Sequence, residues 1–254
     1  MPWIIFQVGA TRNGPFTSPA AGARMRLPVQ EERGVASLTI ENYVKAIYQL
    51  SAEGEGEMAS TGALAETLAV SPSTVTSMLK TLSESGLAQY IPYGGAKLTD
   101  AGRSLALRVV RRHRLIELFL VKTLRLTWDE VHAEAENMEH AVSDLLIDKI
   151  DAYLGYPESD PHGDPIPKAD GTIASPQATL LSALRAGERF KIVRVSDQSP
   201  EFLRYLTDSG LAIGAEGNVA ESRAEAGIVV LHVGQQQTTL AREIAEKLLV
   251  ARRG

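Results

Sequence analysis

The chain has 254 residues, of which 44% are hydrophobic and 22% charged, with a formal net charge of −5. This length allows two domains, and the absence of cysteine excludes disulfides and thiolate metal sites, so that a bound metal would need nitrogen and oxygen ligands. No apolar run approaches the roughly 18 residues of a membrane span, and Ile4-Ile5-Phe6 is too short for a signal-peptide core, so we expect a cytoplasmic protein.

Residues 1–34 show no periodicity and are rich in Gly, Pro, Ala and Arg. We interpret them as a disordered arm, or as sequence upstream of a natural start near Met25. An ordered strand from Trp3 to Val8 is the less favoured alternative.

Residues 35–105 carry the pattern of a winged helix. One helix is predicted from Leu38 to Leu50, a second from Gly62 to Leu68 with Thr61 as N-cap, and a third that begins at Ser71-Pro72 and stops near Gly86. Leu87 to Ile91 and Lys97 to Thr99, joined by Tyr93-Gly94-Gly95-Ala96, then predict a hairpin. Two short helices and a hairpin indicate a helix-turn-helix with a wing.

The third helix is the candidate recognition helix, because its small hydroxyl side chains suit close approach to bases and phosphates in a major groove. We expect its DNA contacts to come from Ser71, Ser73, Thr74, Thr76, Ser77 and Lys80. Residues 35–105 hold seven acidic and four basic groups, which argues mildly against strong phosphate attraction and suggests help from a metal ion and dimerisation.

Residues 106–155 are predicted to be helical, with one long helix from Asp100 to about Arg125 and another from Trp128 to about Leu154, capped by Thr99 and Thr127. His113 and Glu117 are four residues apart, as are His132 and Glu136. Residues at this spacing share a helix face, so imidazoles and carboxylates converge, as a divalent first-row metal requires. Glu136 and Glu139, followed by His140, extend the second cluster.

The acidic character of this region supports the same interpretation. From Leu126 to Asp164 the chain has eleven Asp or Glu residues against one Lys, and Arg108, Arg111, Arg112 and Arg114 precede the block. Such a block either repels itself or is neutralised by cations. Leu115, Leu118, Phe119, Leu124, Val142, Leu145 and Leu146 are expected in the core and the dimer contact.

A Pro-rich linker or structured loop follows at residues 156–178, and residues 179–254 predict a small barrel. Arg189 to Val195 alternates as a strand, and Ser199-Pro200 starts a short helix through Leu206. Further strands are predicted at residues 217–221, 228–233 and 237–240.

This order of elements resembles the diphtheria-toxin-repressor family of metal-dependent transcriptional regulators, over roughly residues 36–250. The resemblance rests on motifs in every part of the chain: Glu41-Asn42-Tyr43, Val70-Ser71-Pro72-Ser73-Thr74-Val75-Thr76, Arg112-His113-Arg114-Leu115 with Glu117, Val131-His132-Ala133-Glu134-Ala135-Glu136, Met138-Glu139-His140, Pro161-His162-Gly163-Asp164-Pro165-Ile166-Pro167, and Pro200-Glu201-Phe202-Leu203-Arg204-Tyr205-Leu206 with Gly210-Leu211. It implies a mainly α fold with an N-terminal winged helix-turn-helix, a helical dimerisation domain and a C-terminal SH3-like barrel.

The resemblance implies two metal sites in each protomer. The primary site would use Glu136, Glu139, His140 and Asn42, where Asn42 stands at a position that is typically Met in iron-responsive members and Asp in manganese-responsive ones. Glu136 stands where iron-responsive members have Cys, which favours Mn²⁺, with Fe²⁺ as the alternative. The second site would gather His113, Glu117 and His132, with Asp160 and His162 from the loop and Glu201 or Asp197 from the barrel. His232, in a strand pattern, is interpreted as structural.

The expected partners are double-stranded operator DNA and a second copy of the chain, with no membrane. A metal that joins the first helix to the dimerisation helices would fix the spacing of two recognition helices on a palindrome, with a coupling of about 1–3 kcal/mol. Repression of metal-uptake genes is the default expectation.

Two alternatives remain from the sequence alone. One is a metallohydrolase, although no His-Glu-x-x-His motif, nucleophile elbow or phosphate loop is present. The other is a winged-helix regulator that senses a small organic ligand. We therefore predict a metal-dependent regulator and not an enzyme.

Overall fold

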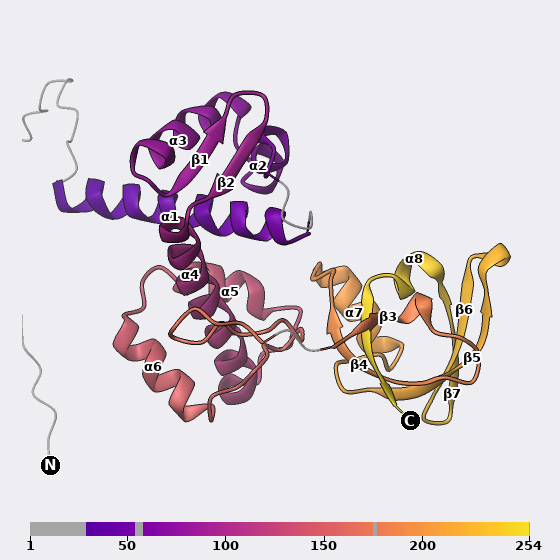
Figure 1. The fold of residues 1–254 in the computed structure, drawn as a ribbon. Coiled ribbons are helices and arrows are strands. Elements are labelled where there is room, and N and C mark those ends of the chain that lie inside the picture. Colours follow the sequence, from indigo (N-terminus) through magenta and orange to yellow (C-terminus); the bar gives the residue numbers. More distant parts are fainter. Residues whose placement is uncertain (1–28, 54–57, 175–176, 254) are drawn as a thin grey trace, which may run out of the picture.

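The structure is a computed structural model that describes residues 29–53, 58–174 and 177–253. Figure 1 shows these residues as three parts in chain order: a winged helix, a helical part beside it, and a small β-barrel at the other end. Each part has its own cluster of buried apolar side chains. The order of the three parts is the one that the sequence predicts.

The winged helix consists of α1 (Val29–Glu53), α2 (Thr61–Thr67), α3 (Pro72–Glu84) and the antiparallel strands β1 (Ala88–Ile91) and β2 (Gly95–Leu98). Val44 and Ile47 of α1 pack with Leu79 of α3 in its core. The hairpin turn requires Gly95, whose φ is +103° and where a Cβ atom would lie 2.5 Å from the Ala59 carbonyl oxygen.

Of the two N-caps predicted for the winged helix, one is confirmed and one is displaced by a residue. Ser71 caps α3 through its hydroxyl, which accepts from Thr74 N, and Pro72 follows at the first helical position. For α2, however, the prediction of Thr61 as N-cap is wrong by one residue: the Ser60 hydroxyl accepts from Ala63 N.

The helical part contains α4 (Asp100–Phe119), a π-helical turn (Leu120–Leu124), α5 (Val131–Met138) and α6 (Asp144–Tyr153). Thr99 caps α4, as predicted. The prediction of one helix from Trp128 to Leu154 is wrong, because the chain turns after Met138 and the Ser143 hydroxyl caps a separate helix by accepting from Leu146 N.

The barrel is an antiparallel six-stranded sheet in the order β3-β8-β4-β5-β6-β7. Its elements are β3 (Thr179–Leu180), a 3₁₀ turn (Leu181–Ala183), β4 (Arg189–Val195), α7 (Pro200–Asp208), β5 (Glu216–Arg223), a 3₁₀ turn (Ala224–Ala226), β6 (Ile228–Val233), β7 (Gln236–Ala241), α8 (Arg242–Ala245) and β8 (Leu248–Arg253). The sequence predicted β4, α7, β5, β6 and β7. It missed β3, α8 and β8, which are short or carry charged residues at their ends.

The Pro-rich loop joins the helical part to the barrel. The amide of Val195 donates to the His162 carbonyl oxygen at 3.0 Å, and the Trp128 indole donates to the Thr207 hydroxyl at 2.9 Å. Gly163 has φ +86°, and a Cβ atom there would lie 2.0 Å from the Val193 carbonyl oxygen, so only glycine allows this close approach. The loop is thus held against β4.

Some predictions about the chain's ends and core need correction. Residues 29–34 were included in the predicted arm but belong to α1, whereas the Trp3–Val8 alternative and the start near Met25 lie outside the described residues. Three of the leucines predicted for the core or the dimer contact are exposed on the protomer and are therefore not core residues: Leu124, Leu145 and Leu146. Within the described ranges, no helix is both long and apolar enough to cross a bilayer.

Candidate metal centre and DNA-reading helix

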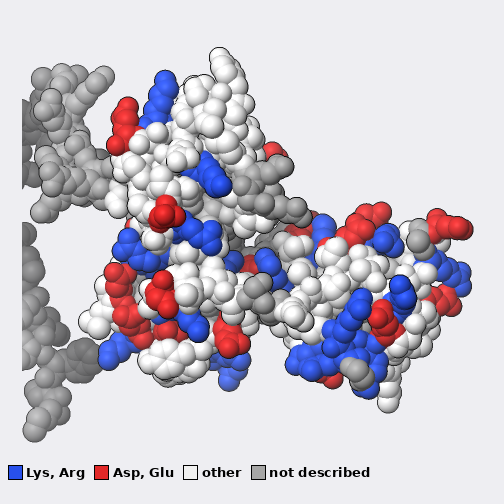
Figure 2. All heavy atoms as spheres, in the orientation of Figure 1, with Lys and Arg blue, Asp and Glu red and all other residues white. Residues whose placement is uncertain are grey.

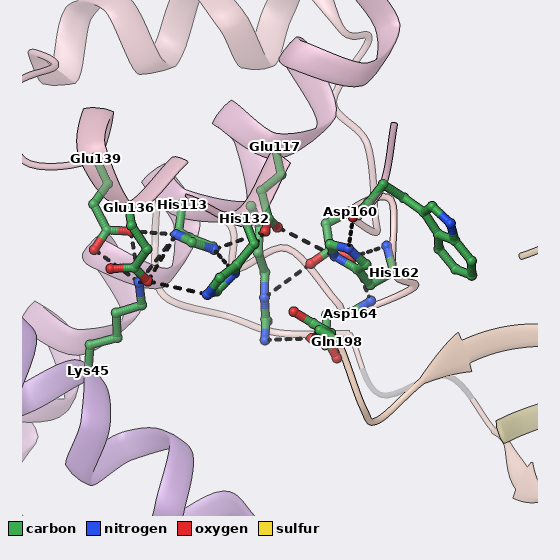
Figure 3. A network of polar contacts seen from close by, with 12 residues as sticks. Lys45, His113, Glu117, His132, Glu136, Glu139, Asp160, His162, Asp164 and Gln198 are labelled. Atoms are coloured by element: carbon green, nitrogen blue, oxygen red, sulfur yellow. Dashed lines mark hydrogen bonds and ion pairs between the residues drawn. The ribbon is translucent and has the colours of Figure 1, made fainter. Parts of the chain in front are cut away.

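The first polar cluster lies where side chains of α1, α4 and α5 meet (Figure 3). Glu139 is fully buried, and Glu136 beside it is partly exposed. The Lys45 ammonium, from α1, is 2.6 Å from Glu136 Oε1 and donates to the two Glu139 oxygens at 3.0 and 2.8 Å. A buried lysine therefore lies between two of the carboxylates predicted to bind the primary metal.

His113 links this cluster to a second one. Its Nδ1 lies 2.6 Å from Glu139 Oε2 and its Nε2 lies 3.0 Å from Glu117 Oε1, so both ring nitrogens donate to carboxylates. Burial alone would lower the pKa of His113, but these hydrogen bonds raise it to about 9. Burial would likewise raise the pKa of Glu139, yet the hydrogen bond from His113 and the charge of Lys45 hold it below its usual value.

The structure brings Asn42 and His140 together, as the predicted primary ligand set requires. His140 Nε2 lies 2.7 Å from Asn42 Oδ1 and 3.3 Å from Glu139 Oε1, while its Nδ1 lies 2.8 Å from Glu41 Oε2. Among the described residues, the triad here with ligand atoms close enough for one ion is His113, Glu136 and Glu139. The predicted primary ligand set remains a prediction: Glu136, Glu139, His140 and Asn42. The sequence did not predict that Lys45 would contact two of these residues.

The second cluster is centred on the buried Glu117. Its Oε1 accepts from His113 and from His132, whose Nδ1 is 3.3 Å away, and its Oε2 lies 3.8 Å from His162 Nδ1. Burial favours a raised pKa for Glu117, but the hydrogen bonds from the two histidines outweigh it and lower the pKa well below the ordinary value. Glu117 thus stays ionised at the centre of three imidazoles.

His162 is oriented for ligation by its surroundings. The side chain is fully buried, and its Nε2 lies 2.7 Å from the Trp128 carbonyl oxygen, so that nitrogen carries the proton. Its Nδ1 has no hydrogen-bond partner although it is buried. An unpartnered ring nitrogen facing Glu117 and Asp160, with the other nitrogen fixed by a carbonyl, is an arrangement typical of a metal-binding histidine.

Asp160 completes this arrangement. Its Oδ1 accepts from the backbone amides of His162 and Asp164, and its ligand atom lies within 4.8 Å of those of Glu117 and His162. Burial, followed by the charges of Asp164 and Glu117, raises the pKa of Asp160 well above the ordinary value. Two buried carboxylates this close need positive charge beside them, and Arg114 supplies part of it, since its Nε lies 3.6 Å from Asp160 Oδ2.

The barrel contributes in a different way from the prediction. Gln198 donates to Asp164 Oδ2 at 2.8 Å, which fixes the loop that carries Asp160. Glu201 is exposed on α7 and is not part of any of the three clusters found among the described residues. Asp197 accepts from Lys247 at 2.7 Å, on the barrel itself.

Much of the acidic block is neutralised by the arginines that precede it. Arg111 donates to Asp151 at 2.8 Å and Arg112 donates to Asp144 at 2.7 Å. Figure 2 shows the interleaved charges over this part of the molecule, next to a largely uncharged winged helix. The block as a whole therefore does not require metal ions, and the case for a metal rests on the buried clusters.

The candidate recognition helix α3 presents its polar side as predicted. Ser71, Ser73, Thr74, Ser77 and Lys80 are exposed, whereas Val75, Leu79 and Leu82 are buried. Thr76 is half-buried and its hydroxyl donates to the Pro72 carbonyl oxygen. Thr76 and Lys80 also line a groove between α3 and Tyr93 at the tip of the wing.

Comparison with known proteins places these features in a family. Residues 36–96 match the family model "Iron dependent repressor, N-terminal DNA binding domain", residues 99–168 match "Iron dependent repressor, metal binding and dimerisation domain", and residues 179–252 match the FeoA domain. The iron-dependent repressor IdeR of Mycobacterium leprae is 30% identical over 225 residues, which cover 84% of this chain and 96% of IdeR. The chain belongs to the diphtheria-toxin-repressor family of metal-dependent transcriptional repressors.

Other relatives agree with this assignment. The diphtheria toxin repressor of Corynebacterium glutamicum is 33% identical over 207 residues, covering 77% of this chain and 89% of the relative. A solved manganese-dependent transcriptional repressor in complex with manganese has 40% identity and a TM-score of 0.75, and covers 84% of this chain and all of that one. The manganese regulator SloR has 33% identity and a TM-score of 0.68, with 84% and 98% covered. The predicted fold and the prediction of a repressor, not an enzyme, are confirmed.

Sequence reasoning missed Lys45, Gln198 and the Trp128 carbonyl. Only Lys45 has a signal in the sequence: it stands between the apolar pairs Tyr43-Val44 and Ala46-Ile47, on a stretch whose residues are buried. A lysine in such a place needs an anionic partner, because a buried ammonium is stable only when paired.

Proposed function

We propose that this chain represses transcription in response to Mn²⁺, with Fe²⁺ as the alternative ion, and that a homodimer binds a palindromic operator. In this proposal the ion is held by Glu117, Asp160 and His162, with His113 and His132 beside them. The observation that carries it is the buried, unpaired Nδ1 of His162, directed at two buried carboxylates.

The donor set supports this choice of ion. The chain has no cysteine, and the cluster offers only imidazole nitrogens and carboxylate oxygens. Such donors suit Mn²⁺ and Fe²⁺ better than thiophilic ions. When bound, the ion supplies positive charge that replaces the proton which the raised pKa of Asp160 implies.

The chain's own residues relate this cluster to the DNA-reading helix. His162 and Asp160 are on the loop that is fixed to the barrel, Glu117 and His113 are on α4, and His113 contacts Glu139, which Lys45 of α1 holds. Figure 3 shows these side chains as one continuous network. Since α1 packs beneath α3 in a shared core, a change in the network can alter the position of the recognition helix. Measured affinities for the ion and the operator test this coupling.

The decisive experiment compares operator binding by chelator-treated and Mn²⁺-loaded protein in a mobility-shift titration. We expect operator affinity to rise by about 5–150-fold with Mn²⁺, the usual range of such coupling. Fe²⁺ under anaerobic conditions distinguishes the two ions, and measured transcript levels of metal-uptake genes identify the targets. Equal operator binding by chelated and loaded protein would refute the proposal.

The cluster itself is tested with His162→Gln and, as a matched control, His232→Gln on an exposed part of β6. We expect the first variant to lose Mn²⁺-dependent operator binding and the second to behave like wild type. Circular dichroism checks that both variants fold. A full metal response in His162→Gln would show that the ion binds elsewhere.

A further inference from the structure

We propose that Lys45 is a built-in cation that takes the place of a metal ion between Glu136 and Glu139. The ammonium ties α1 of the winged helix to α5 permanently, so that each protomer binds a regulatory ion only at the cluster of Glu117, Asp160 and His162. The single ion site rests on the function proposed above, whereas the role of Lys45 depends only on its own contacts.

The contacts of Lys45 are those of a satisfied ammonium. Its Nζ is within hydrogen-bond distance of one Glu136 oxygen and both Glu139 oxygens, and an ammonium has three protons to donate. The side chain is 7% exposed, so these bonds form away from bulk water, where they are strongest. Figure 3 shows Lys45 reaching from α1 to the two carboxylates.

The charges present leave little reason for a further cation at this place. Glu136 and Glu139 carry two negative charges, and Lys45 supplies one positive charge within 3.0 Å of each. His113 Nδ1, which also bonds to Glu139, lies only 3.2 Å from the ammonium. A divalent ion held by the same oxygens would face the ammonium as a like charge at close range, which is strongly unfavourable in a buried site.

The neighbouring side chains agree with this interpretation. His140 is engaged by Asn42 and Glu41 and is not in the triad of close ligand atoms with Glu136 and Glu139. At the second cluster the unpaired His162 Nδ1 supports a bound ion. Here both ring nitrogens of His140 and both oxygens of Glu139 have hydrogen-bond partners. The residues at this place therefore fit an ammonium better than they fit a metal ion.

Counting bound ions tests the proposal directly. Wild type, Lys45→Met and Lys45→Arg would be dialysed against MnCl₂, and bound Mn²⁺ would be measured by elemental analysis. Lys97→Met, at an exposed position of β2, is the matched control. We expect one additional ion per protomer in Lys45→Met alone, because that variant removes the charge and leaves the carboxylates.

Thermal unfolding gives a second readout without DNA. In chelator, Lys45→Met should melt roughly 10 °C below wild type, because a buried carboxylate loses its partner. Mn²⁺ should restore most of that loss, and Lys45→Arg should lose less. Restoration by Mn²⁺ would show that an ion can replace the lysine.

The outcomes distinguish failure of the role of Lys45 from failure of the proposed ion site at Glu117, Asp160 and His162. Two ions per protomer in wild type, or no additional ion in a folded Lys45→Met protein, would overturn the role of Lys45. If wild type binds no ion and Lys45→Met binds one, the role of Lys45 is supported while the proposed site around Glu117 fails.

Discussion

Arg111 forms a buried ion pair between two helices and also donates to the Pro-rich loop that carries Asp160 and His162, which makes its contribution to stability testable. Arg111 on α4 donates to Asp151 on α6 at 2.8 Å and to the Pro167 carbonyl oxygen at 3.1 Å. The two charged side chains are 10% and 11% exposed. Arg111→Met removes the guanidinium, keeps most of the volume, and leaves the Asp151 carboxylate buried without its partner.

The expected magnitude follows from that unpaired charge. Removing one partner of a buried pair costs about 3–5 kcal/mol of folding free energy. Replacing both partners, as in Arg111→Met with Asp151→Leu, should cost only about 1 kcal/mol, because the lost hydrogen bond to Pro167 is then the main deficit. The double variant should therefore be about 2–4 kcal/mol more stable than Arg111→Met alone, so that the second substitution compensates for the first.

Urea unfolding of chelator-treated protein, followed by circular dichroism, measures all four corners of this cycle. Mn²⁺ affinity is the second readout: both Arg111 variants lose the anchor at Pro167, so we expect weaker binding in both, with the double variant closer to wild type. A double variant as unstable as Arg111→Met would show that desolvation of Asp151 is not the cause, and the reasoning would fail.

Further outcomes follow from other parts of the structure. Glu117→Gln should weaken Mn²⁺ binding by at least ~100-fold, measured by calorimetry, with the exposed Glu134→Gln unchanged as its control. Ser77→Asp should weaken operator binding more than ~10-fold by repulsion of phosphate, while Mn²⁺ affinity without DNA stays constant. Leu145→Asp should convert the dimer to a monomer in light scattering, since Leu145 is 69% exposed on the protomer. Burial would raise the pKa of Asp197, but the hydrogen bonds from Lys247 and Ser199, with the charge of Lys247, hold it below its usual value. The carboxylate therefore contributes stability above pH ~4, the unfolded-state pKa, and this contribution is lost as pH falls below that value. Thermal unfolding of Asp197→Asn should show less loss over that range.

The sequence predicted those parts of the site that depend on local geometry. His113 and Glu117 share a face of one helix, and their hydrogen bond at 3.0 Å is a direct result of their spacing. Ser71 before Pro72 likewise specifies the start of α3, because the cap needs only its own hydroxyl and the amides that follow.

The parts that could not be predicted depend on contacts between distant segments. Lys45 and Glu139 are 94 residues apart, and their ion pair exists because α1 lies against the end of α5. The prediction of one helix from 128 to 154 was wrong because the helical periodicity continues across Ser143, where the chain ends one helix and caps the next. In the structure Gln198, and not Glu201, contacts the loop that carries Asp160, because the fold of the barrel decides which side chain faces that loop.

The two clusters share His113, and this sharing has a consequence for how metal and DNA influence each other. If the lysine contact is permanent and only the second cluster exchanges ions, then His113 is the side chain through which occupancy at Glu117 reaches Glu139 and α1. Coupling free energy is reciprocal, so operator DNA must raise ion affinity by the same factor by which the ion raises operator affinity. In this arrangement the charge of Lys45 is the same with and without the ion, whereas His113 contacts both clusters and would pass the effect of the ion from one to the other. Under this proposal one ion decides whether the repressor binds DNA, because Lys45 already supplies the positive charge beside Glu136 and Glu139.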